Sequence, residues 1–341
     1  MARRKKSEQA VNLKLGPTSH RCREAIQKAL HLVQRIAIFL GVSWSSLSTD
    51  DLEHVDLFMA DVVQYMFDHK FPHYLAVYSV LAIQKHFRAR HRLIESWSCI
   101  KTWKLHTPAR KRLPISFNIV QGMCLCLLNR AGYLSGHERA NCLALVIFFV
   151  VGFHGLLRPG EIFKLRFDDI GLPTDMAIAG ELVAVIMIHE PKNRLTYGRN
   201  QFVHVEDSVA IAWISWWKSL FSPGEFLFPS KRVLRVLFRD VLAELSLDSV
   251  AYTFAGLRAG GATSHFRTHR DIVSLQYLGR WQSLRTISHY LQEAMSAQLR
   301  VTMPALAVKK LESWLRFSHL LKTPPVSALV RRPARYGKQR A

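Results

Sequence analysis

Residues 155–170 read GLLRPGEIFKLRFDDI, in which a turn leads from an apolar stretch into a helix. The uncharged stretch at residues 140–157 falls short of the ~20 residues that a membrane-spanning helix needs, and it contains His154. These features favour a helix that is buried in a protein core. Arg158 follows this stretch directly, in apolar surroundings where a lone surface arginine is less expected.

Three further motifs follow along the chain. The first is Lys192 in the sequence PKN, between two apolar segments. The second, at residues 256–263, reads GLRAGGAT and contains Arg258. The third reads LGRW at residues 278–281, and Tyr290 lies nine residues after its tryptophan and 32 residues after Arg258. Each motif alone is a weak signal, so the information lies in their order.

The residues around these motifs predict a mainly helical domain with a small β-sheet. Residues 181–189 are β-branched and apolar, and residues 201–205 alternate, which predicts a β-hairpin with a long loop. Helical patterns occupy most of the rest, at residues 117–130, 138–152, 230–246, 257–268, 271–278, 283–294 and 304–321. The predicted fold class is therefore mainly α with a small β-sheet, that is, α+β.

The part of the chain before residue 105 has a separate helical pattern. Apolar residues recur at spacings of three and four between residues 25 and 40, which gives one amphipathic face. Residues 105–115, LHTPARKRLPI, combine two prolines with three basic residues, which is typical of a linker across a basic surface. The predicted organisation is a basic flexible arm at 1–18, a helical domain at 19–104, a linker at 105–115, a second domain at 116–322 and a basic tail at 323–341.

The chain is strongly basic, with 47 lysines and arginines against 25 aspartates and glutamates and a formal charge of +22. A hydrophobic fraction of 49% supplies enough material for a core, which argues against a disordered basic protein. The charge argues against a protein that handles small neutral metabolites, and it indicates nucleic acid or an anionic membrane as a partner. Because no uncharged stretch is long enough to span a membrane, we expect nucleic acid and no membrane.

The sequence indicates neither a metal site nor a nucleotide cofactor. The five cysteines lack the spacing of zinc modules and disulfide frameworks, so we expect reduced, buried thiols. His265 and His269 stand four residues apart without a third ligand, which favours solvated or DNA-facing histidines. Dinucleotide, P-loop, HExxH and GxSxG motifs are absent from the sequence. We therefore expect no metal and no cofactor.

The motifs place five residues in a fixed order, namely Arg158, Lys192, Arg258, Trp281 and Tyr290. In this order they resemble the tyrosine recombinases, the phage-integrase-like family that includes site-specific recombinases of mobile elements. The resemblance covers residues 155–292 by motif and implies a helical DNA core-binding domain at 19–104 and a catalytic domain at 116–322. It also implies that the chain breaks and rejoins double-stranded DNA, in site-specific recombination or integration, through a covalent 3′-phosphotyrosine. The implied assembly is a homo-oligomer, a tetrameric synapse on DNA.

The resemblance assigns a catalytic role to each of these five residues, and elementary chemistry supports the roles. The phenol of Tyr290 is the nucleophile, which stores the energy of the phosphodiester bond covalently. The guanidiniums of Arg158 and Arg258 clamp the non-bridging oxygens of the pentacoordinate phosphate. Lys192 protonates the leaving 5′ oxygen, and the indole N–H of Trp281 donates to the phosphate. A core tyrosine, structural ion pairs, a surface lysine and a packing tryptophan are the alternatives.

Further residues are expected to support the site or to bind DNA. Glu161, one helical turn from Arg158, is expected to hold this arginine in its rotamer. Arg280 is expected to add a phosphate contact. Phosphate contacts elsewhere, with ordinary solvated positions as the alternative, are expected from Arg110, Lys111, Arg112, Arg194 and Arg199.

Ala255 departs from the family's pattern, which has a histidine three residues before the second arginine. An imidazole that could accept the tyrosine proton is therefore missing, and water, His265 or His289 are the alternatives. The departure favours a second reading of the chain, as a catalytically impaired DNA-binding descendant of a mobile-element recombinase. A type IB topoisomerase-like activity, which shares the chemistry, is a third. The basic residues 2–6 predict a nuclear location in a eukaryote, and otherwise the cytoplasm or nucleoid.

The segment after Tyr290 is longer than the chemistry needs. Val308, Leu311, Trp314 and Leu315 form an apolar stripe at helical spacing. In the family, a helix past the tyrosine docks on a neighbouring protomer, so the resemblance implies such a contact here. Packing of the stripe on its own domain is the alternative.

Overall fold

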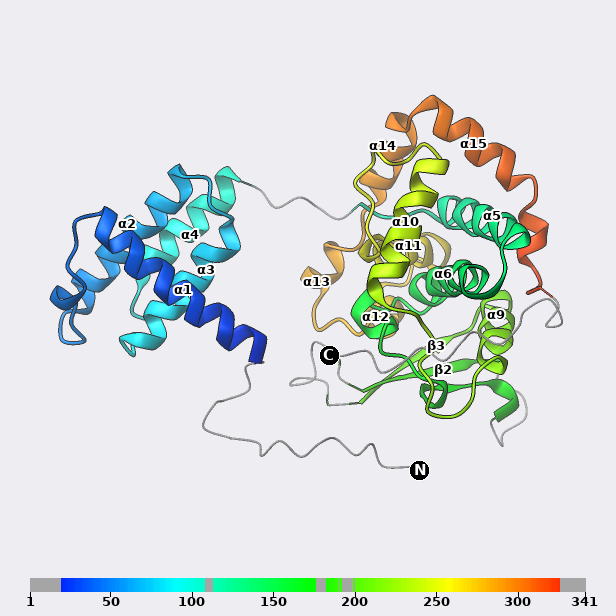
Figure 1. Ribbon diagram of the computed structural model, residues 1–341, viewed down its shortest axis with the longest axis horizontal. Coiled ribbons are helices and arrows are strands. Elements are labelled where there is room, and N and C mark those ends of the chain that lie inside the picture. The colour runs from blue at the N-terminus through cyan, green and yellow to red at the C-terminus, as the bar shows by residue number, and fades with distance from the viewer. Residues whose placement is uncertain are drawn as a thin grey trace. The chain divides into compact units, whose positions relative to one another are not determined.

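The computed structural model describes residues 20–107, 113–175, 182–189, 191, 198 and 200–325, and Figure 1 labels its elements. The chain divides into two compact units, Met1–Arg110 and Lys111–Ala341, and the division falls inside the segment 105–115. Each unit has a hydrophobic core of its own. The predicted arm at 1–18 and most of the predicted tail lie outside the described residues.

The described part of the first unit is helical. It contains α1 (His20–Phe39), a 3-10 turn at Trp44–Ser46, α2 (Leu52–Asp68), α3 (His73–His86) and α4 (Ile94–His106). α1 packs against α3, and α2 packs against α4. Val33 and Ile36, on the predicted apolar face of α1, are buried in this core together with Val55 and Met59 of α2. The helical spacing in the sequence thus produces the packing of the unit.

A buried carboxylate joins two helices of the first unit. Asp56 of α2 is only 6% exposed, and its carboxylate accepts hydrogen bonds from the backbone N–H groups of Glu95 (2.8 Å) and Ser96 (2.9 Å). The hydroxyl of Ser96 also donates to it, at 2.5 Å. The first N–H groups of a helix have no partner within the helix, and the helix dipole favours a negative charge there. Asp56 therefore caps the N-terminus of α4 from a position 39 or more residues away in the sequence.

The second unit contains most of the secondary structure. Its helices are α5 (Phe117–Tyr133), α6 (Gly136–His154), α7 (Pro159–Ile162), α9 (Ser208–Ser219), α10 (Lys231–Glu244), α11 (Ala255–His269), α12 (Ile272–Gly279), α13 (Leu284–Ser288), α14 (Glu293–Thr302) and α15 (Ala305–Leu315). Its strands are β1 (Ile170–Gly171), β2 (Ala184–Ile188) and β3 (Gln201–Val205), and 3-10 turns lie at Phe167–Asp169, Pro173–Asp175 and Ser318–Leu321. These elements confirm the predicted α+β class.

The described strands form one antiparallel sheet in the order β1-β2-β3. Ile186 pairs with Val203, and both side chains are buried, whereas the alternate residue Phe202 is exposed. Alternation of this kind places one face of a sheet against the core and leaves the other face to solvent. The predicted hairpin of β2 and β3 is therefore present, and β1 is a strand that the sequence did not predict.

Helix α6 lies at the centre of the second unit, in contact with α5, α9, α10 and α11 (Figure 1). Within the described residues it is the one helix long and apolar enough to span a membrane, with a mean hydropathy of 1.3 in its most apolar window. Two-thirds of that window (67%) is buried inside the protein. Phe148 and Phe149, both fully buried, pack in the core with Phe163, Phe228, Phe238 and Phe254.

Two predicted helices are shorter than the sequence suggested. The predicted helix at 283–294 is divided into α13 and α14, because the chain leaves the helical path between residues 288 and 293. The predicted helix at 304–321 ends at Leu315 and is followed by a 3-10 turn. Helix α9 was not predicted, although Asp207 caps it by accepting from the backbone N–H of Ala210 at 2.7 Å.

The apolar stripe after the tyrosine packs on its own domain. Leu311 of α15 is 6% exposed and lies against α5, where a Cβ on Gly122 would be 2.6 Å from its Cδ2 atom. Trp314 is partly buried in the same core. Figure 1 shows α15 beside α5. At these two positions, packing on the chain's own domain is therefore the observed alternative.

Candidate active site

Arg158 is held at the start of a short helix by a residue three positions ahead. It is the N-cap residue of α7, and the carboxylate of Glu161 accepts from its backbone N–H at 2.8 Å. The Nη1 atom of Arg158 also donates to Oε1 of Glu161 at 2.8 Å. Pro159 occupies the first helical turn, where its missing N–H is tolerated. The Arg158 side chain is 24% exposed and that of Glu161 7%, so the pair lies at the edge of the core.

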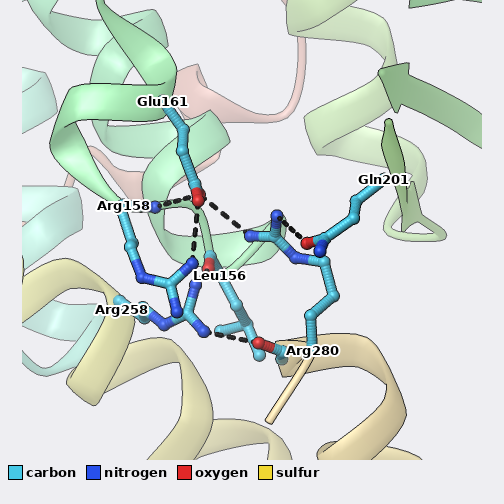
Figure 2. Close-up of polar contacts among 7 residues, drawn as sticks. Leu156, Arg158, Glu161, Gln201, Arg258 and Arg280 are labelled. Atoms are coloured by element: carbon cyan, nitrogen blue, oxygen red, sulfur yellow. Dashed lines mark hydrogen bonds and ion pairs between the residues drawn. The ribbon is translucent and has the colours of Figure 1, made fainter. Parts of the chain in front are cut away.

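Arg258 is the most buried cation among the described residues of the site, at 2% exposure in the first turn of α11. Its Nη1 atom donates to the carbonyl oxygen of Leu156 at 2.5 Å, and its Nη2 atom donates to that of Gly279 (Figure 2). Burial, together with the positive charges of Arg158 and Arg280, lowers the pKa of Arg258. Its Nε atom has no hydrogen-bond partner among the described residues. Because a guanidinium has five N–H donors, this side chain retains capacity for a further acceptor.

The glycines around Arg258 let its helix approach neighbouring backbone. A Cβ atom on Gly260 would lie 1.8 Å from the carbonyl oxygen of Ile115, and one on Gly261 would lie 2.1 Å from that of Phe153. Neither position can hold a larger residue unless the backbone moves. The GLRAGGAT motif therefore sets the depth at which α11 packs, and with it the position of Arg258.

Arg280 reaches the same carboxylate from the other side. Its Nη2 atom donates to Oε2 of Glu161 at 2.9 Å, and its Nη1 atom lies 3.4 Å from Oε1 of Gln201 (Figure 2). The side chains of Arg280 and Glu161 are each 7% exposed. The structure thus engages Arg280 with Glu161, whereas its expected contact with a phosphate stays a prediction.

The cluster carries more positive than negative charge. Its described side chains are three guanidiniums, those of Arg158, Arg258 and Arg280, and one carboxylate, that of Glu161. Burial alone would raise the pKa of Glu161, but the charges of Arg280 and Arg158 outweigh it and lower this pKa. The carboxylate is therefore ionised at neutral pH, and these four side chains together carry a surplus of two positive charges. A surplus of this kind in a low-dielectric site favours an anionic ligand.

Tyr290 lies beside this cluster, in the turn between α13 and α14. Its ring is 4.9 Å from the ring of Trp281, and the guanidinium carbon of Arg258 is 5.3 Å from its centroid. The turn is tied to α11, because the hydroxyl of Thr263 donates to the carbonyl of Tyr290 at 3.2 Å and accepts from the N–H of Gln292 at 3.3 Å. These contacts explain why the predicted helix at 283–294 is interrupted at the tyrosine.

Trp281 is 2% exposed and packs in a small core with Leu156, Leu275 and Ile287. A Cβ atom on Gly279 would lie 1.9 Å from its ring, so the glycine of the LGRW motif makes room for the indole. The guanidinium carbon of Arg258 lies 4.7 Å from the centre of the indole ring, a cation–π contact. Trp281 therefore packs against both Arg258 and Tyr290.

Several predicted residues lie outside the described part of the chain. These are Lys192, Arg194 and Arg199, which lie between β2 and β3 in the sequence, and Arg110, Lys111 and Arg112 of the predicted linker. Their roles stay predictions. Ala255 is described and is the first residue of α11.

Sequence reasoning missed the acceptors that hold Arg258 and the partners of Arg280. The carbonyls of Leu156 and Gly279 are backbone groups, which have no signature in a sequence. Leu156 adopts the left-handed backbone conformation with φ +46°, which is uncommon for a residue other than glycine.

Among the described residues, no three His, Cys, Asp or Glu side chains form a group that could hold a metal ion. The rings of His265 and His269 stand 4.5 Å apart.

Solved structures share the fold of this chain, although no protein-family model and no curated protein matches its sequence. The Tn1549 transposon integrase in complex with circular intermediate DNA is 11% identical with a TM-score of 0.54, over 85% of this chain and 96% of that one. A lambda integrase dimer bound to a core site is 13% identical with a TM-score of 0.51, over 83% and 74% of the two chains. Both are tyrosine recombinases. The chain therefore has the tyrosine recombinase fold, as its motifs predicted.

Proposed function

We propose that this chain breaks and rejoins double-stranded DNA, with Tyr290 as the nucleophile. The observation that carries the proposal is the cluster of three guanidiniums around one carboxylate, next to a tyrosine ring 5.3 Å from the nearest guanidinium carbon. A phosphodiester is the anion that this arrangement fits, because forked donors match its two non-bridging oxygens. The fold and the net charge of +22 support DNA as the source of that phosphodiester.

The proposed reaction consists of two balanced transfers. The phenol of Tyr290 gives up its proton to water as its oxygen attacks the scissile phosphorus. A phosphotyrosine bond forms, and the bond to the 5′ oxygen of the next nucleotide breaks. Lys192 donates a proton to that oxygen, which leaves as a hydroxyl. Rejoining reverses these steps with a 5′ hydroxyl of another strand, and Tyr290 recovers its proton. Arg158 and Arg258 stabilise the extra negative charge of the pentacoordinate state in both transfers.

Ala255 supports a second candidate function, that of a protein that binds DNA without cutting it. It stands at the start of α11, three residues before Arg258, and a methyl group can neither accept the phenol proton nor donate to a phosphate. In this second candidate the arginine cluster still holds a phosphate, and no covalent bond to DNA forms. Covalent capture of DNA separates the two candidates.

The experiment uses a pool of duplexes with randomised sequence. In each duplex the strand to be cut carries a nick close to the cleavage position. Cleavage then releases a short fragment, and rejoining cannot occur. The full chain is incubated with the pool, and covalent protein–DNA adducts are separated under denaturing conditions and sequenced. We expect an adduct from the wild-type chain and none from Tyr290→Phe, which lacks the attacking oxygen. The matched control is Tyr277→Phe, because Tyr277 is 85% exposed on α12. Binding without an adduct would overturn the strand-transfer proposal and leave the DNA-binding candidate.

The assembly and the location of the protein are proposals of the same kind. We expect copies of the chain to assemble on a captured site as a tetrameric synapse, which mass measurement of the isolated complex checks. Relaxation of arbitrary supercoiled plasmid by the monomer would instead support a topoisomerase. In a eukaryotic host we expect a nuclear location, directed by the basic residues 2–6.

A further inference from the structure

Arg280 joins three segments of the second unit that are far apart in the sequence. Its backbone is in the left-handed conformation (φ +55°) and ends α12, one residue before Trp281. Its side chain donates to Glu161, 119 residues away, and approaches Gln201, 79 residues away. Figure 2 shows its guanidinium between these two side chains, on the opposite side of Glu161 from Arg158.

Each of these segments carries part of the proposed catalytic apparatus. Glu161 binds both the backbone and the guanidinium of Arg158. Gln201 is the first residue of β3, nine residues after Lys192 in the sequence. The third segment runs from Arg280 itself into Trp281 and then to Tyr290, whose rings are in contact.

We propose that Arg280 is a positioning residue, which acts through Glu161 to hold the clamp arginine Arg158 in register with the tyrosine segment. The inference rests on the proposed function. The two carboxylate oxygens of Glu161 have different donors. Oε1 accepts from Nη1 of Arg158, and Oε2 accepts from the backbone N–H of Arg158 and from Nη2 of Arg280. Without Arg280, Oε2 keeps only the backbone bond, so the carboxylate and the Arg158 guanidinium gain freedom to rotate.

The rival role for Arg280 is a direct contact with the scissile phosphate. Its guanidinium is 7% exposed and is paired with a carboxylate of equal burial, which favours the positioning role. The planar fork of an arginine serves Glu161 and Gln201 together, whereas the single ammonium group of a lysine is a point charge. A lysine at this position therefore retains the charge and only part of the geometry.

The experiment compares Arg280→Met, Arg280→Lys, Glu161→Gln and the double variant Glu161→Gln/Arg280→Met in the full chain. For each, we measure the dissociation constant for a captured DNA site, the single-turnover rate of adduct formation and the thermal midpoint. We expect Arg280→Met to reduce the rate by roughly 10- to 100-fold, as a small misplacement of reacting groups does, with DNA affinity unchanged. We expect the rate of Arg280→Lys to lie between those of Arg280→Met and the wild type. Arg316→Met, at an exposed arginine after α15, serves as the control that leaves the rate unchanged.

The double variant distinguishes the two roles of Arg280. If Arg280 acts through Glu161, its loss adds nothing once Glu161 is changed, so the double variant is no slower than the slower single variant. If the rate reductions of the two single variants instead multiply in the double variant, the inference is overturned in favour of a direct contact between Arg280 and the phosphate. A wild-type rate in Arg280→Met, a parallel loss of DNA affinity, or loss of folding in both Arg280 variants would also overturn it. In each of these cases the wild-type adduct still supports the proposed function, whereas a wild-type chain that forms no adduct overturns both.

Discussion

The two units each bury a carboxylate, and they treat it differently. In the first unit, Asp56 accepts from two backbone N–H groups and one hydroxyl at the start of α4, with no cation on its oxygens among the described residues. In the second unit, Glu161 lies between two guanidiniums, and a third, that of Arg258, lies in the same cluster. In the first arrangement the negative charge of Asp56 is compensated by the positive end of the α4 dipole.

The two carboxylates differ in the groups that surround them, because Asp56 accepts from neutral donors whereas Glu161 is shared by two guanidiniums. Asp56 joins α2 to α4, and the contacts of its carboxylate and of Ser96 all lie within the unit. The cluster around Glu161 keeps a surplus of positive charge after all its described ion pairs are counted. In a low-dielectric site, this surplus on the described side chains favours the binding of an anion.

Glu161→Gln should have the largest effect on stability. The change removes the carboxylate charge that Arg158 and Arg280 share, and breaking a buried ion pair in this way costs about 3–5 kcal/mol. Denaturant unfolding of the full chain measures the loss, with Glu312→Gln on the exposed face of α15 as the matched control. If Glu161→Gln lowers the free energy of unfolding no more than the control does, the cluster tolerates three guanidiniums without this carboxylate. The proposed difference between Glu161 and Asp56 would then be wrong.

Arg258→Lys should have the next largest effect, on the rate of adduct formation. A lysine retains the charge but cannot donate to the carbonyls of Leu156 and Gly279 and to a phosphate at once. Loss of one preorganised donor reduces the rate by about 10²–10³. Single-turnover cleavage of a captured DNA site gives this rate. Cleavage at the wild-type rate would mean that the charge alone suffices and that the buried fork has no role.

Asp56→Asn should have a smaller effect, confined to stability. The amide retains one acceptor oxygen but turns an NH₂ group toward donors, which leaves a buried group unsatisfied at a cost of about 1–3 kcal/mol. Unfolding measurements check the cost, with the exposed Asp61→Asn on the same helix as the control. The adduct rate should not change. A change in that rate would link the first unit's cap to the chemistry and would remove the distinction between the two carboxylates.

The smallest effect is the pH dependence of the Glu161 contribution. Its pKa in the folded chain is lowered below the usual 4.5, because Arg280 and Arg158 outweigh the opposing effect of burial. Its stabilising contribution is therefore complete above pH 4.5 and is lost as the pH falls through the folded pKa. The free energy of unfolding of the wild type minus that of Glu161→Gln should shrink as the pH falls from neutral through the folded pKa of Glu161, because the unfolded chain binds this proton more tightly. A difference that grows toward low pH would mean that burial dominates.

The sequence predicted the parts of the site that depend on short-range spacing. Arg158 and Glu161 stand three residues apart, so their pairing follows from the geometry of one helical turn. The order of the motifs predicted the fold, and the alternation in residues 201–205 predicted a strand. The sequence did not predict the break at Tyr290, because that break depends on Thr263, which lies on another helix.

What the sequence by itself determined is therefore the fold class and the local pair of Arg158 with Glu161, and it also predicted which arginine, tryptophan and tyrosine residues are candidates for the site. Only the tertiary structure decided that Arg280 binds Glu161 across 119 residues and that Asp56 caps a helix 39 residues away. The physical reason is that helical and strand periodicities repeat over a few residues, so they specify which face of an element is apolar. Which two faces meet depends on the packing of the whole core, where three glycines of α11 and Gly279 set the distances of closest approach.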